Sequence, residues 1–162
     1  MEAKAIGFAT FVALQSFAAS AADLAGSANV SLSRIIALNE DAPMSFGVIA
    51  TNSKQCTVTL SPAGAVTCPS QPFQFSGASA AATFTTTGNS STPVTITFST
   101  GDALAGPGSA MTLNNFQHDA GPTPALDGGG SLTFNVGADL RVKNNQVSGL
   151  YSGSYTVSVN YQ

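Results

Sequence analysis

The most constraining feature of this sequence is a regular alternation of large apolar and small polar side chains near its C-terminal end. The apolar positions are Tyr155, Val157, Val159 and Tyr161, and the residues between them are Thr156, Ser158 and Asn160. A period of two predicts a β-strand that buries one face against a hydrophobic core. Because no further strand follows in this sequence, we expect its far edge to be covered by an earlier strand or by another molecule.

The composition favours an all-β domain that hydroxyl and amide groups keep in solution. Charged residues make up only 8% of the 162 residues, whereas Thr, Ser, Val, Gly and Phe, which suit strands and tight turns, are abundant. This length is sufficient for one domain with its own core. The formal net charge of -3 argues against binding to a phosphate backbone, so nucleic acid is not expected as a partner.

The N-terminal residues have the pattern of a signal peptide. Lys4 provides a basic start, residues 5–17 are mostly apolar, and a small-residue cleavage signal ends at Ala21. We expect residues 1–21 to be removed, with cleavage there or one residue later, and residues 22–162 to form one domain. A retained membrane anchor or a buried helix is the alternative, although a spanning helix needs roughly 20 apolar residues. We expect an exported protein without a membrane span in its mature chain, reaching the cell surface or the medium through the periplasm.

A second alternating stretch follows the expected cleavage site. Its apolar face consists of Ala28, Val30, Leu32, Ile36 and Leu38. Arg34 interrupts this face. A charge at that position predicts two short strands separated by a bend rather than one long buried strand.

Short apolar runs separated by turn residues continue along the chain. Their spacing predicts an immunoglobulin-like β-sandwich with mostly antiparallel strands, and a barrel is the alternative. Residues 101–108 are rich in Gly, Ala and Pro, and residues 117–130 form the longest expected loop. The expected strands contain residues 44–49, 56–60, 66–68, 73–75, 82–84, 94–98, 111–116, 132–136, 140–142 and 155–161.

The two cysteines flank an expected hairpin. With a turn centred on Pro62, the opposed pairs are Leu60 with Gly64, Val58 with Val66, and Cys56 with Cys68. Opposed Cβ atoms lie about 4.5 to 5.5 Å apart, close to what a disulfide needs. A bulge at Gly64 would shift this register. Because paired cysteines are usual in exported proteins, we predict a Cys56–Cys68 disulfide.

The sequence contains no recognisable catalytic or metal-binding set. Its one histidine, His118, is interpreted as an exposed loop residue, since few titratable groups accompany it. The aspartates lie in turn-like segments, where this residue usually bonds to its own backbone, and calcium binding through Asp127 is the alternative. The lack of tryptophan disfavours a carbohydrate-binding surface. We therefore expect neither enzymatic activity nor a cofactor.

Several short motifs follow one another in a defined order. They are Met-Ser-Phe-Gly-Val-Ile (44–49), Val-Thr-Leu-Ser-Pro-Ala-Gly (58–64), Ala-Thr-Phe-Thr-Thr-Thr-Gly (82–88), Met-Thr-Leu-Asn-Asn-Phe (111–116), Leu-Thr-Phe-Asn-Val-Gly-Ala-Asp-Leu (132–140) and Gly-Leu-Tyr-Ser-Gly-Ser-Tyr-Thr-Val-Ser-Val-Asn-Tyr (149–161). In this order the chain resembles a bacterial pilin-like family, known as domain of unknown function forty-four zero two. The last motif is also similar to the terminal strands of chaperone-usher fimbrial subunits and of spore-coat-protein-U-like domains.

The resemblance implies a structural role, as a subunit of a bacterial fimbria or surface filament that assembles by β-strand donation. In that role the sandwich is incomplete, and a strand from an identical or related subunit completes it. A periplasmic chaperone and an outer-membrane usher are the further partners that the resemblance implies. The implied donor residues are Ala28, Val30 and Leu32, and the implied acceptor strand carries Tyr155, Val157, Val159 and Tyr161.

The alternative is a self-contained, adhesin-like binding module that is secreted or held at the cell surface. In that case the N-terminal strand folds back onto its own sandwich, and residues 117–130 contact a ligand. Arg34 distinguishes the two hypotheses. As a hinge it lets the preceding segment leave, whereas as an edge residue that reaches water it keeps the strand within its own subunit.

Overall fold

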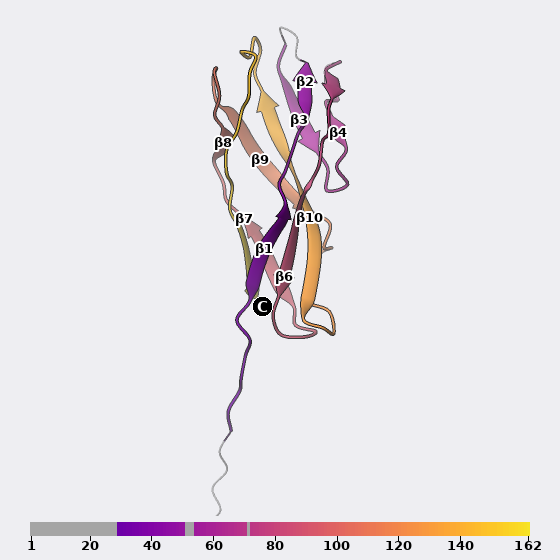
Figure 1. Ribbon diagram of the computed structural model, residues 1–162, viewed down its shortest axis with the longest axis vertical. Helices are drawn as coiled ribbons and strands as arrows, with labels where there is room; N and C mark the ends of the chain where they lie inside the picture. The colour runs from indigo at the N-terminus through magenta and orange to yellow at the C-terminus, as the bar shows by residue number, and fades with distance from the viewer. Residues whose placement is uncertain (1–28, 51–53, 71) are drawn as a thin grey trace, which may run out of the picture. The chain divides into compact units, whose positions relative to one another are not determined.

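All regular structure in the described part of the chain is β-strand. The computed structural model describes residues 29–50, 54–70 and 72–162. The chain divides into two units, Met1–Leu32 and Ser33–Gln162, and every strand belongs to the second (Figure 1). The strands are β1 (Ala37–Ala42), β2 (Val48–Ala50), β3 (Cys56–Leu60), β4 (Val66–Thr67), β5 (Gln74–Ser76), β6 (Ala82–Thr87), β7 (Val94–Phe98), β8 (Asp102–Leu104), β9 (Met111–His118), β10 (Ser131–Val142) and β11 (Val157–Tyr161).

The strand pairs of the described residues are all antiparallel, which confirms the prediction of an all-β, antiparallel fold. The largest sheet has seven strands, and its main path runs β1-β6-β10-β3-β4. In addition, β9 pairs with β10 and with β8. Two smaller sheets contain β11 with β7 and β2 with β5. The immunoglobulin-like arrangement stays a prediction.

The long strand β10 changes its partner at Gly137. Along one edge it pairs with β6 as far as Val136 and then with β3 from Ala138 onward. The backbone that leaves β3 therefore passes close to Gly137. A Cβ at this position would overlap the carbonyl oxygen of Leu60. Glycine is therefore the only residue that fits at position 137, where β10 changes from β6 to β3.

The core consists of two clusters of buried side chains, and β10 contributes to both. The first contains Leu113 and Leu140 together with the disulfide cysteine Cys56. In the second cluster, Val94 of β7 and Val159 of β11 pack with residues of β6 and β10. The small sheet of β7 and β11 is thereby held against the large sheet.

The predicted Cys56–Cys68 disulfide is confirmed, but the hairpin has a different register from the one expected. Leu60 pairs with Val66 rather than with Gly64. The reason is the turn, in which Gly64 adopts a φ of 82° and lengthens the connection. The two cysteines therefore do not lie directly opposite each other, and their Cα atoms are 6.3 Å apart.

Loss of the disulfide should lower stability without changing self-association. The bond closes a short loop, so replacing both cysteines by serine should reduce the free energy of unfolding by about 3 kcal/mol. Urea denaturation of the oxidised parent and of the double variant measures this difference, and light scattering gives the oligomeric state. Altered self-association at unchanged stability would contradict the purely structural role.

Several boundaries differ from those expected. β1 begins only at Ala37, and residues 29–36 form no strand. β8 occupies part of the Gly- and Pro-rich region 101–108, and β9 extends to His118, into the predicted loop. The predicted signal peptide, residues 1–21, and Ala28 lie outside the described residues.

Candidate functional site

A long groove of about 1080 Å³ runs between two segments that are far apart in the sequence. One wall is residues 38–50, from β1 through β2, and the other is residues 146–157, which lead into β11. The walls run in opposite directions, because the start of β1 lies beside the end of the chain (Figure 1). We call the end near Leu38 and Val157 the base, and the end near β2 and residues 146–150 the mouth.

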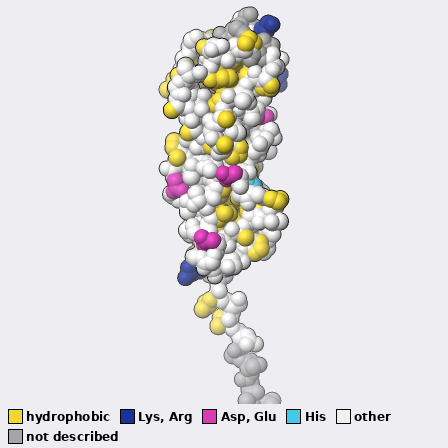
Figure 2. Space-filling model, turned by 90° about the vertical axis from the view of Figure 1, so that its right-hand side faces the viewer, with side chains coloured by type: hydrophobic (Ala, Val, Ile, Leu, Met, Phe, Trp, Pro, Cys, Tyr) yellow, Lys and Arg dark blue, Asp and Glu magenta, His cyan; other side chains and the backbone are white. Residues whose placement is uncertain are grey.

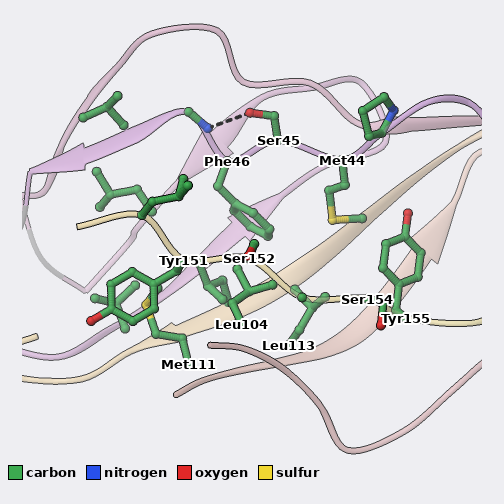
Figure 3. Close-up of a pocket in the computed structure, with 18 of the residues that line it drawn as sticks. Met44, Ser45, Phe46, Leu104, Met111, Leu113, Tyr151, Ser152, Ser154 and Tyr155 are labelled. Carbon is green, nitrogen blue, oxygen red and sulfur yellow. Dashed lines mark hydrogen bonds between the residues drawn. The ribbon is translucent and has the colours of Figure 1, made fainter. Parts of the chain in front are cut away.

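The floor of the groove is formed by residues of the hydrophobic core. Leu113 and Leu140, at its centre, are only 2% and 1% exposed. From the first wall, Met44 and Phe46 point toward this floor (Figure 3). The remaining large apolar residues of the floor are Phe84, Leu104, Met111 and Val142. The groove can therefore bury apolar side chains that enter from outside.

Each wall also contains strands that have a partner on one side only. Within the described residues, β1 pairs with β6, β2 with β5 and β11 with β7, and none of the three has a second neighbour. Residues 153–156 of the second wall belong to no strand. Unpaired edges present free backbone N–H and C=O groups, which an added strand can bind.

Tyr155 is the main aromatic residue of the second wall. Its ring stacks on Phe116 at a centroid distance of 5.0 Å and meets the edge of Phe84 at 6.5 Å. Its hydroxyl is buried and has no hydrogen-bond partner among the described residues. Burial, and to a smaller extent the charge of Glu40, raises the pKa of Tyr155 to about 12.

This tyrosine predicts a loss of stability in alkali. The folded state favours the neutral phenol, so stability is retained below pH 10.0, the ordinary pKa, and falls as the pH rises toward about 12. Tyr155→Phe should remove this part of the decline. Chemical denaturation across the alkaline range measures it, and an equal decline in the variant would refute the assignment.

Hydrogen bonds join the chain segments of the two walls just beyond the base of the groove. The Tyr161 hydroxyl accepts from the backbone N–H of Asn89 at 2.8 Å and donates to the carbonyl oxygen of Arg34 at 3.1 Å. The Arg34 N–H donates to Oδ1 of Asn89 at 2.8 Å, and Nδ2 of Asn89 donates to Oγ of Ser33 at 2.9 Å. These bonds, which we call the base anchor, tie the start of β1 to the end of β11.

The predicted donor and acceptor residues have different surroundings. Tyr155 and Val157 line the groove, whereas Val159 is in the second core cluster and Tyr161 is in the base anchor. Of the predicted donor residues within the described range, Val30 is 83% and Leu32 is 91% exposed. Sequence reasoning missed the wall of residues 38–50, although its motif at 44–49 was recognised.

His118 is not an exposed loop residue, contrary to the sequence-based interpretation. It is the last residue of β9 and is half-buried, with its ring 6.1 Å from that of Phe98 and 6.2 Å from that of Phe134. The reason is that β9 continues to pair with β10 up to this position. Its Nδ1 is buried without a hydrogen-bond partner in the described part of the chain.

The prediction that the aspartates bond to the backbone of their own turns holds for Asp127 but is wrong for Asp102 and Asp139, which lie in β8 and β10 and accept from side chains. Oδ1 of Asp127 accepts from the backbone N–H groups of Gly129 and Ser131 at 2.8 and 2.9 Å. Asp119 accepts instead from the backbone and side chain of Asn135, which is 16 residues away in the sequence. Among the residues that the structure describes, no three His, Cys, Asp or Glu side chains are grouped so that they could hold a metal ion.

The fold and the groove define an antiparallel β domain with an apolar cleft bordered by unpaired strand edges. The chain belongs to the family described as Domain of unknown function (DUF4402), whose model matches residues 36–161. This confirms the predicted family, while the pilin-like similarity stays a prediction. The match includes both walls of the groove and begins just after Arg34. Comparison with curated proteins and with solved structures gave no match.

The described residues were also searched for helices that could span a membrane. In the part of the chain that is described, no helix has the length and apolar character needed to cross a bilayer. The surface is also poor in charge, and on the face seen in Figure 2 a few acidic and basic side chains lie among hydrophobic and uncharged polar atoms.

Proposed function

We propose that this protein is a structural subunit of a surface filament, and that its groove accepts an extended strand from a neighbouring copy. The distribution of exposed large apolar side chains carries this proposal. Within the described residues they occur in two places only. One set lines the groove and consists of Leu38, Val48, Val147 and Leu150, and the other precedes β1 and consists of Val30, Leu32 and Ile35.

The groove and the segment before Arg34 have the properties of an acceptor and a donor. The groove offers an apolar floor and unpaired strand edges, and the segment before β1 offers apolar side chains at alternate positions. In strand addition, backbone hydrogen bonds provide affinity and side-chain pockets provide specificity. Contiguous exposed apolar surface on a folded protein usually marks such an interaction site.

The free energy expected from adding the donated strand is large for a domain of this size. Burying three or four aliphatic side chains contributes roughly 5 to 10 kcal/mol. The total stability of a typical domain is about 5 to 15 kcal/mol. A subunit with an empty groove should therefore be only marginally stable as a monomer.

The base anchor supports donation to another copy rather than insertion into the same one. Both backbone groups of Arg34 are hydrogen-bonded, so the chain is fixed three residues before β1 begins. A segment that folded back into its own groove would have to reverse direction at this point. This favours the hinge interpretation of Arg34 over that of an edge residue within a continuous strand.

Removal of the preceding segment tests the proposal. The mature, oxidised protein should form multimers in size-exclusion chromatography with light scattering, and a chain beginning at Arg34 should be monomeric with a lower melting temperature. A folded monomer before truncation would instead support the self-contained binding module, and an unchanged melting temperature after truncation would refute strand donation. The same proposal includes export with the help of a periplasmic chaperone and an outer-membrane usher. Secretion of the protein by cells that lack the chaperone or the usher tests this part.

A further inference from the structure

Ile35 has a position that strand donation by itself does not explain. Its side chain is 91% exposed, but it lies on the body side of the base anchor rather than in the segment that would be donated. The inference that follows rests on the proposed function and concerns how consecutive copies contact each other.

The position of Ile35 on the body is fixed from both sides. The residue before it, Arg34, is held through its N–H by Asn89 and through its carbonyl oxygen by Tyr161. The residue after it, Ile36, packs against the second core cluster. Ile35 is therefore an apolar projection from the base of the domain, not part of a free tail.

The mouth of the groove carries the complementary surface. Val48, Val147 and Leu150 line it and are 60%, 53% and 86% exposed. The backbone of Val147 is held in place, since the Tyr151 hydroxyl donates to its carbonyl oxygen at 2.8 Å and accepts from the N–H of Gly108 at 3.0 Å, and Val48 is paired with Ser76 of β5. The apolar surface at the mouth is thus prearranged on the folded domain.

Chain connectivity brings the two surfaces together. A donated strand must leave the accepting groove through one of its ends, and beyond the base the hydrogen bond between Tyr161 and Arg34 joins the two sides across its path. It therefore leaves through the mouth, and the first residues of the donor's folded body lie there. We infer that Ile35 of the donating copy packs against Val48, Val147 and Leu150 of the accepting copy. This second contact between copies is heterologous, base to mouth, and such contacts produce open filaments.

Cysteine cross-linking in the full mature chain tests the contact directly. The variant with Ile35→Cys and Leu150→Cys should give a ladder of covalent multimers under mild oxidation, because each copy links to the next. The matched control combines Ile35→Cys with Thr95→Cys, which places the second cysteine at an exposed position of β7 outside the groove. It should give no ladder. Multimers without a ladder in the first variant would overturn this contact and leave strand donation intact.

A second variant measures what the contact contributes. Leu150→Asp should accelerate dissociation of the multimers about tenfold, since one large aliphatic side chain loses its apolar partner surface. Ile35→Val, which retains most of the apolar side chain, should leave the rate nearly unchanged. Equal dissociation rates for the parent and Leu150→Asp would refute the contact. If the parent protein forms no multimers at all, the proposed function itself fails.

Discussion

Gly137→Ala should prevent the domain from folding. The added Cβ would overlap the carbonyl oxygen of Leu60, which belongs to the paired backbone of β3 and cannot rotate away like a side chain. Relief requires separation of β10 from β3 and exposure of the first core cluster. We expect a loss of more than about 5 kcal/mol, comparable with the total stability of a typical domain.

The control for this substitution is Gly128→Ala. Gly128 lies in the turn before β10, and a Cβ there meets no atom within 4 Å. Circular dichroism and urea denaturation of the two variants compare the same chemical change at a crowded and at an open position. A cooperative transition for Gly137→Ala at the parent's midpoint would show that β3 and β10 are not held together as described.

A synthetic peptide should restore stability to the chain that begins at Arg34. With the sequence of residues 22–33, the peptide supplies Val30 and Leu32 to the groove floor and backbone groups to its walls. At a peptide concentration about a hundredfold above its dissociation constant, the melting temperature should rise by about 10 °C. Thermal unfolding with and without peptide measures the shift.

The matched control peptide carries Val30→Ser and Leu32→Ser. It keeps the length and the backbone hydrogen-bonding groups but lacks the apolar side chains, so it should produce little or no shift. Equal stabilisation by both peptides would mean that the groove does not select apolar side chains, and the donor assignment would then be wrong.

The sequence predicted the strands better than their pairing. Two alternating patterns, near Val157 and Val159 and from Val94 to Phe98, were sufficient to place β11 and β7, since side-chain periodicity is a local property. That these two strands pair with each other depends on packing between distant segments. The same holds for β10. Its change of partner is marked in the sequence only by the glycine at position 137.

The groove was predicted only in part, for a similar reason. Tyr155 and Val157 were found because they alternate, but residues 146–154 have no apolar periodicity. They form a wall because glycines allow close packing. At Gly153, for example, a Cβ would overlap the carbonyl oxygen of Ala103. Arg34 was singled out for its charge, whereas the structure uses its backbone, bonded to side chains of residues 89 and 161.

The base anchor also determines how the domain would carry mechanical load. A pull on the segment before Ser33 reaches Asn89 and Tyr161 directly through the backbone of Arg34. Because the backbone continues from Arg34 into β1, the force then acts along the length of β1 and its partner β6. Hydrogen bonds loaded in this direction must break together rather than one after another. Resistance to tension is set by the rate of forced unfolding and not by equilibrium stability. A subunit with a small free energy of unfolding can therefore still withstand a large force.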